Sequence, residues 1–187
     1  MQRSNFGRIV ATLFVGLLVI GSAAADQTFE TNDTKITVPT ASPVQFTAFE
    51  QYDVAAFEGQ FTISGIYRYG YLTNDPKNDA HYGELDLTFV PDHADAIKLP
   101  YLRSFGPIKE LFFENSAKFV KDSIPQDKLN LLRQRKLYSI SGRVTIRVDR
   151  YKAWAECGSP YYRVRFLGLE QPAEIRLSRK ATEIYGC

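Results

Sequence analysis

Two long stretches of alternating apolar and polar residues constrain the fold of this chain most strongly. One spans residues 61–71 and the other residues 138–148, and each places large apolar side chains on alternate positions. Successive side chains of a β-strand point to opposite faces, so this period fits a half-buried strand and not a helix. The pattern therefore predicts a mainly β protein whose core lies on one face of each strand.

The two stretches belong to a longer internal similarity. The segment FTISG at residues 61–65 matches YSISG at residues 138–142, an offset of 77 residues. The other segments that align at this offset, or one residue beyond it, are 85–89 with 162–166 and 97–99 with 175–177. This similarity predicts two similar three-strand units, residues 60–100 and 137–178. A true duplication and a chance match between alternating strands both explain it.

The segments around these units complete the expected architecture. Residues 107–136 predict a short helical insert, in which residues 108–113 could alternatively form a strand. Residues 26–58 predict an extended N-terminal leader, because their Thr, Asp and Pro residues show little periodicity. We expect a β-rich domain at residues 59–187, folded as a small antiparallel barrel or sandwich. Its element order resembles that of oligonucleotide/oligosaccharide-binding (OB) barrels.

Residues 1–25 have the composition of a secretory signal peptide. Arg3 and Arg8 precede an apolar run at residues 9–20, and three alanines at residues 23–25 supply the small side chains of a cleavage site. A helix of about 12 residues spans about 18 Å, which is short of the roughly 30 Å hydrocarbon layer. The pattern predicts an exported protein, periplasmic or extracellular, with no transmembrane span after cleavage. An uncleaved anchor is the alternative.

The chain has two cysteines, Cys157 and Cys187. Export would bring both into an oxidising compartment, where cysteines of small domains commonly pair. We therefore predict a disulfide between them that fastens the C-terminal end of the chain to a loop at Cys157. A reactive thiol is the alternative.

The charges of the chain are distributed unequally. Residues 26–100 carry 4 basic and 12 acidic side chains, a net charge of −8, whereas residues 101–187 carry 17 basic and 9 acidic side chains, a net charge of +8. Two halves of opposite sign indicate either internal ion pairing or contact with charged partners.

Signals for catalysis are sparse. The two histidines, His81 and His93, do not stand at a spacing typical of zinc ligands, and the chain contains no GxSxG nucleophile motif. We therefore predict no catalytic residue, no metal and no cofactor. The alternative function is an envelope hydrolase or metal-dependent enzyme that uses His81, His93 and nearby Asp residues such as Asp92 and Asp95.

The clearest candidate site is basic. Alternation directs Arg143 and Arg147 to the outer face of one strand, and Arg163 and Arg165 to the same face of its expected partner. Like charges on facing strands repel each other, so this cluster calls for an anionic counterpart. Lys152 and Trp154, in an expected loop at residues 151–160, add a cation and a ring that can stack on a sugar or a base.

Several counterparts fit such a face. The acidic half of the protein itself could neutralise the arginines, within one chain or by self-association. An anionic glycan, a lipid head group or an acidic protein would suit the planar fork of arginine. Nucleic acid matches the charge, but export makes it an uncommon ligand. The sequence thus predicts an exported, non-catalytic binding or accessory protein that contacts an anionic ligand or surface.

Overall fold

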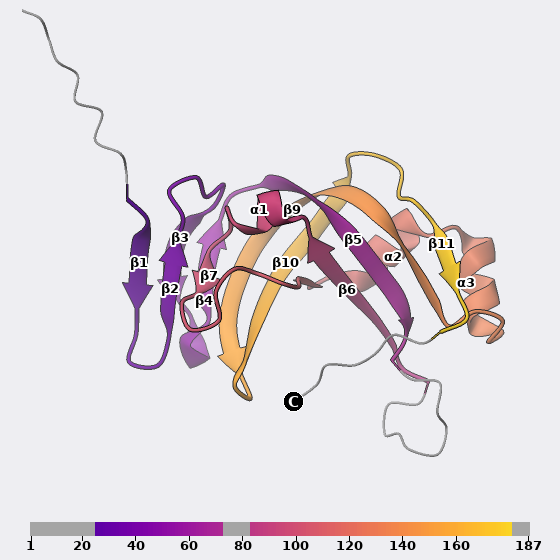
Figure 1. Ribbon diagram of the computed structural model, residues 1–187, viewed down its shortest axis with the longest axis horizontal. Helices are drawn as coiled ribbons and strands as arrows, with labels where there is room; N and C mark the ends of the chain where they lie inside the picture. The colour runs from indigo at the N-terminus through magenta and orange to yellow at the C-terminus, as the bar shows by residue number, and fades with distance from the viewer. Residues whose placement is uncertain (1–24, 73–82, 181–187) are drawn as a thin grey trace, which may run out of the picture.

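The structure, a computed structural model, describes residues 25–72 and 83–180, and this part of the chain is mainly β (Figure 1). The prediction of a mainly β protein is confirmed. The strands are β1 (Gln27–Glu30), β2 (Lys35–Val38), β3 (Gln45–Phe49), β4 (Ala55–Glu58), β5 (Phe61–Tyr71), β6 (Leu85–Pro91), β7 (Tyr101–Leu102), β8 (Phe112–Phe113), β9 (Ser139–Glu156), β10 (Ser159–Leu169) and β11 (Arg176–Ser178). The helices are η1 (Gln51–Asp53, a 3₁₀ turn), α1 (His93–Ala96), α2 (Ser116–Ser123) and α3 (Gln126–Arg133).

The strands form two sheets. A small sheet has the order β1-β2-β7, and a larger one runs β3-β4-β9-β10-β8, with β5 pairing β9 and β6 pairing β5. Strand β11 also pairs with β9. The long, curved strand β9 therefore pairs with most strands of the larger sheet (Figure 1). Neither sheet closes into a barrel, because β6 meets the segment before β8 through only one isolated bridge, Phe89 to Leu111. The predicted barrel is therefore not formed.

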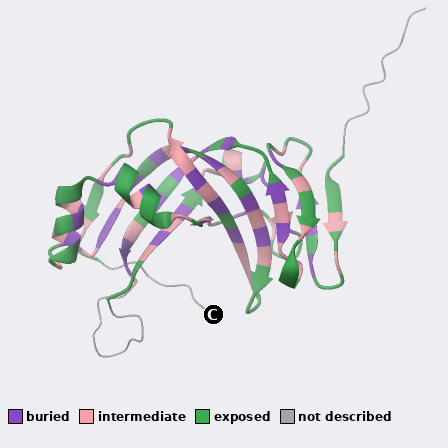
Figure 2. Ribbon diagram, turned by 180° about the vertical axis from the view of Figure 1, so that it is seen from behind, coloured by how far each residue is buried: buried purple, intermediate pink, exposed green. Residues whose placement is uncertain are grey.

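The core lies on the concave side of the larger sheet, as the alternation predicted. Buried and exposed residues alternate along β5, β9 and β10 (Figure 2). Helix α2 covers this side with Phe119, which is fully buried and packs its ring 5.4 Å from Tyr67, 5.0 Å from Phe113 and 5.2 Å from Phe166. Burial of large aromatic side chains of this kind supplies much of the stability of a small domain.

Residues 26–58 differ from the expected extended leader. They form β1 to β4 and contribute Ile36, Val38 and Val44 to the core. Phe29 of β1 stacks on Phe46 of β3 at 4.1 Å, and β4 pairs with β9. The sequence pattern missed these strands because each has only four or five residues, too few to show a clear period.

The helical insert is found only in the second part of residues 107–136. Helices α2 and α3 are separated by Pro125, which is the N-cap of α3. Before them, Phe112 and Phe113 form the short strand β8, in line with the alternative that we gave for residues 108–113. The two predicted three-strand units agree in their first two strands, β5 with β9 and β6 with β10. The third strand forms only in the second unit, as β11. The matching residues 97–99 of the first unit form a turn after helix α1.

The predicted signal peptide falls almost wholly outside the described residues and stays a prediction. Within residues 25–72 and 83–180, no helix combines the length and the apolar character that crossing a membrane requires.

Candidate ligand-binding face

The outer, convex face of β9 and β10 carries all four predicted arginines. Arg143, Arg147 and Arg163 are exposed, and Arg165 is half-buried. Their neighbours along the strands, such as Val144, Val148 and Val164, point into the core, so the sheet itself directs the guanidinium groups outward.

Three of the four arginines are held by carboxylates of the same chain. Arg165 forms a two-pronged contact with Asp149, at 2.8 Å from Nε and 2.5 Å from Nη2. Arg147 lies 3.4 Å from Glu170, and Arg143 bonds Asp92. These pairs offset the repulsion between neighbouring cations. The interpretation that the protein neutralises its own arginines therefore applies to most of the predicted face.

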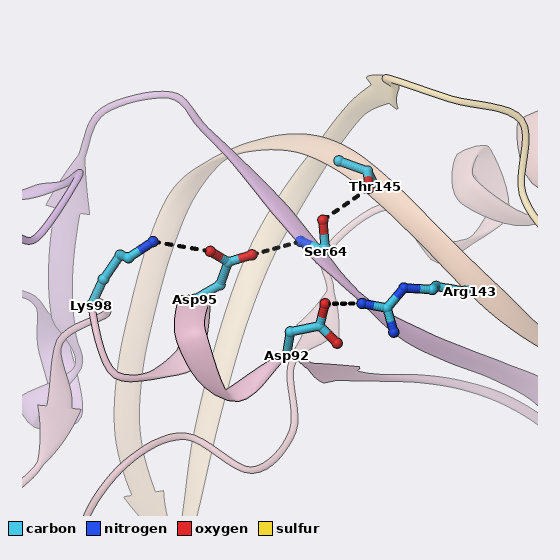
Figure 3. Close-up of polar contacts among 6 residues, drawn as sticks. All are labelled: Ser64, Asp92, Asp95, Lys98, Arg143 and Thr145. Atoms are coloured by element: carbon cyan, nitrogen blue, oxygen red, sulfur yellow. Dashed lines mark hydrogen bonds and ion pairs between the residues drawn. The ribbon is translucent and has the colours of Figure 1, made fainter.

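The Asp92 contact belongs to a polar seam that attaches α1 to the sheet (Figure 3). Asp95 accepts a hydrogen bond from the Ser64 backbone N–H at 3.0 Å and pairs with Lys98 at 3.3 Å. The Ser64 and Thr145 hydroxyls are 2.8 Å apart and join β5 to β9. Asp92 and Asp95, which we considered among the metal ligands, thus hold α1 in place.

The alternative enzyme site receives little support from the described residues. His93 is exposed on α1, and His81 lies outside the described residues. Among residues 25–72 and 83–180, no group of three or more His, Cys, Asp or Glu side chains gathers as a metal site would require.

Arg163 differs from the other three arginines, because its described contact is an aromatic ring. Its guanidinium lies 4.8 Å from the centre of the Trp154 ring. Trp154 stacks on Tyr161, its cross-strand partner, at 5.5 Å, and Tyr161 lies 5.8 Å from Phe112. We call Phe112, Tyr161 and Trp154 the aromatic ladder, because the three half-buried rings form a row across β8, β10 and β9.

Lys152 lies beside the ladder because of an irregularity in β9. Arg165 pairs with Asp149 but Arg163 pairs with Lys152, so β9 holds one extra residue, and Arg150 adopts a φ of 52° there. Asp149 faces outward by the regular alternation, and the bulge shifts that alternation so that Lys152 faces outward as well. Lys152 also pairs with Glu50 at 2.7 Å.

Two features of the site differ from the sequence expectation. Residues 151–160 are not a loop: β9 continues to Glu156, and the turn before β10 contains only Cys157 and Gly158. Phe112 was not predicted as part of the site, because β8 has two residues and meets β10 only through tertiary pairing, which leaves no local signal.

Cys157 is exposed in the tight turn between β9 and β10, with a φ of 48°. Cys187 lies outside the described residues, so the predicted bridge between them stays a prediction.

No family model matches this chain, and neither a curated protein nor a solved structure matches it.

Proposed function

We propose that this is a non-catalytic binding protein that holds an anionic glycan on the aromatic ladder, with Arg163 as the cation; Lys152 lies beside it but is already paired with Glu50. One observation carries the proposal. Arg163 is the predicted arginine that contacts a ring instead of a carboxylate, and that ring belongs to a row of three aromatic side chains. The site is therefore smaller than the four-arginine face that the sequence predicted.

The chemistry of the ladder suits a sugar chain. Aromatic rings offer apolar faces on which the C–H groups of a sugar can pack, at low cost in side-chain entropy. The guanidinium fork of Arg163 can bind a carboxylate, sulfate or phosphate group through two hydrogen bonds. The spacings of 5.8 and 5.5 Å between successive rings make a row, which favours a chain-like ligand over a single lipid head group.

We further propose that the larger sheet follows the strand order of an OB fold without closing between β6 and β8. Strand β5 pairs antiparallel with β6 and β9, β10 pairs antiparallel with β9 and parallel with β8, and α2 and α3 lie between β8 and β9 in the chain. OB barrels bind oligosaccharides and oligonucleotides on their second and third strands and adjoining loops. In this comparison β8 corresponds to the third strand of an OB fold, and β9 and β10 correspond to its last two. The aromatic ladder includes β8 and borders the turn between β9 and β10, which supports this placement of the ligand.

Export, proposed from residues 1–25, would bring the site into contact with glycans outside the cytoplasm. It also favours a glycan over a nucleic acid as the ligand. The two ligand classes share stacking and anionic groups, so the experiment must include both.

The test uses Trp154, which is the only tryptophan of the chain, as a fluorescent reporter inside the site. The purified protein is titrated with a carboxylated oligosaccharide, a neutral oligosaccharide and a single-stranded oligonucleotide. We expect the acidic oligosaccharide to change Trp154 emission, and Arg163→Gln to weaken its binding about tenfold, the weight of one charge-assisted contact. Tyr161→Ala should weaken it as well.

Arg143→Gln is the matched control, because Arg143 lies on the same outer face but is held by Asp92 away from the ladder. Equal effects of Arg143→Gln and Arg163→Gln would contradict the proposal, as would the absence of any response to the acidic oligosaccharide. Tighter binding of the oligonucleotide would move the function to single-stranded nucleic acid.

A further inference from the structure

A basic pocket lies where helix α3 ends and β9 begins, and Figure 1 shows the end of α3 beside β11. The pocket has a volume of about 540 Å³. Three cations and three largely apolar side chains line it: Arg135, Lys136, Arg179, Leu131, Leu137 and Tyr138. Among the described residues, no acidic side chain lines it. The pocket lies at the opposite end of β9 from the aromatic ladder and is therefore a separate site.

Two basic segments that are far apart in the sequence meet at this pocket. They are residues 133–136, with the sequence RQRK, and residues 176–180, with the sequence RLSRK, and neither contains an acidic residue. The backbone carbonyls of Ser178 and Lys180 each accept a hydrogen bond of 2.9 Å from the chain at the start of β9. Since Arg179 lies between these two residues, its backbone is fixed beside the pocket.

Arg135 occupies a position where glycine is usual. Helix α3 ends in a Schellman motif, in which the Lys136 N–H donates to the Leu131 carbonyl at 3.0 Å. The Arg135 N–H donates to the Leu132 carbonyl at 2.9 Å, and Arg135 has a left-handed φ of 56°, which is strained for a residue with a Cβ atom. Its guanidinium lies 3.6 Å from the centre of the Tyr71 ring, which fixes the charge at the pocket.

The electrostatic surroundings of the pocket favour an anion. The carbonyls at the C-terminal end of a helix ordinarily repel one. Here the Leu131 carbonyl accepts two backbone hydrogen bonds, and the Leu132 carbonyl accepts one from the backbone and one from the Tyr71 hydroxyl, at 3.2 Å. Glu84 directly follows a glycine that lies against Arg135, so it can offset one of the three positive charges. An excess of at least two cations remains.

We propose that this pocket binds the phosphate group of a phosphate ester, either a soluble small molecule or a lipid head group. A phosphate monoester carries about −1.5 to −2 charges at neutral pH, which matches the excess of cations. The guanidinium forks of Arg135 and Arg179 can each bind two phosphate oxygens, and Lys136 adds a point charge. Half-buried Leu131 and Tyr138 offer an apolar surface to the organic part of the ester. The volume lies within the range of about 300–1,000 Å³ that is typical of small-molecule sites.

The first experiment is a calorimetric titration of the purified protein with glycerol phosphate, with glycerol as the uncharged counterpart. We expect glycerol phosphate to bind and glycerol not to bind. Arg179→Gln and Arg135→Gly should each weaken binding about tenfold, the weight of one charge-assisted contact. Glycine adopts the left-handed conformation without strain, so Arg135→Gly removes the guanidinium and keeps the turn. Emission of Trp154 should not change, because the aromatic ladder is a different site.

Arg176→Gln is the matched control. Arg176 lies on β11 close to Arg179, but it pairs with Glu174 at 3.2 Å and does not line the pocket. If Arg176→Gln weakens binding as much as Arg179→Gln, the protein attracts phosphate only through its general charge and the proposed pocket is wrong. The titration of the wild-type protein stands even if a variant fails to fold, which circular dichroism would show.

The second experiment distinguishes the two sources of the phosphate by flotation with vesicles. One set contains phosphatidic acid in phosphatidylcholine, and the other contains phosphatidylcholine alone. If the protein floats only with the first set, and Arg179→Gln but not Arg176→Gln releases it, the ligand is a lipid head group. Binding of glycerol phosphate without flotation assigns the pocket to a soluble ester. If the wild-type protein binds neither glycerol phosphate nor the acidic vesicles, the proposal is overturned.

Discussion

Buried tyrosine hydroxyls join the strands to backbone groups of the segments that cross them. Tyr151 donates to the Pro100 carbonyl at 2.5 Å, and Tyr67 donates to the Glu174 carbonyl at 2.9 Å. Tyr162 accepts a hydrogen bond from the Leu102 N–H at 3.2 Å. Burial raises the pKa of Tyr67 and of Tyr162 to about 12, so both hydroxyls remain protonated at neutral pH. These contacts give buried backbone groups the partners that they need.

Tyr151 provides the sharpest test of this role. Tyr151→Phe keeps the ring but leaves the Pro100 carbonyl without its donor in a dry interior, so we expect the free energy of unfolding to fall by about 1–3 kcal/mol. Urea denaturation measures the change. Tyr52→Phe is the control, because Tyr52 is 85% exposed and should change stability by no more than about 0.5 kcal/mol. Equal effects of the two changes would contradict the assignment.

For individual residues, the sequence predicted the face of the sheet on which a side chain lies better than the residue that it contacts. Alternation alone was enough to place Arg143 and Arg163 on the outer face. The same alternation directs Asp149 outward, but it could not predict that Lys152 shares that face, because the spacing of three residues between them depends on the bulge at Arg150. Partners such as Glu170 follow from how the strands pair, and pairing is a property of the folded chain.

Two glycines allow the elements of the larger sheet to pack against their neighbours. Gly65 and Gly142 occupy matching positions in β5 and β9, and both lie against backbone. A Cβ atom on Gly142 would lie 1.7 Å from the Glu174 carbonyl oxygen, and one on Gly65 would lie 2.3 Å from that of Val90. Close approach of another backbone is a common reason for glycine inside a strand.

Gly142→Ala should therefore be strongly destabilising. The methyl group can be accommodated only by moving the segment that contains Glu174, so we expect a loss of about 3 kcal/mol or more in unfolding free energy. Gly158→Ala is the comparison: Gly158 has a φ of 72° but no atom within 4 Å of the added Cβ, so only backbone strain of about 1 kcal/mol applies. Denaturant titration of both variants measures the difference, and similar losses would contradict the close-approach argument.

Elements were predictable in proportion to their length. The long strands β5 and β9 stand out in the sequence because many residues repeat the same alternation. Strand β8 has two residues and is held by parallel pairing with β10, so no local signal marks it.

At the scale of the whole molecule, folding brings the two oppositely charged halves of the chain together. Asp92 and Glu50 of the acidic half pair with Arg143 and Lys152 of the basic half. The sequence showed the charge asymmetry but not which charged residues pair, because composition carries no information on which side chains meet. The pairs are exposed, so each contributes at most about 1 kcal/mol, and the aromatic core carries most of the stability.

The predicted bridge between Cys157 and Cys187 would act on the molecule as a whole. Cys157 follows the C-terminal end of β9, while near the start of β9 the Ser139 hydroxyl donates to the Lys180 carbonyl at 2.9 Å. A disulfide would therefore tie the segment after Lys180 to the opposite end of this strand. In the chain-entropy account, closing a loop of about 30 residues stabilises the folded protein by about 3–4 kcal/mol.

The bridge is tested by comparing oxidised and reduced protein. We expect an oxidised chain with no titratable thiol and a mass about 2 Da below the reduced one, because forming the bond removes two hydrogen atoms. The oxidised form should unfold at a higher temperature, and Cys157→Ser should abolish the difference between oxidising and reducing conditions. Two titratable thiols in air-oxidised protein would contradict the bridge. Because the bridge was predicted from export, free thiols would also count against the interpretation of residues 1–25 as a signal peptide.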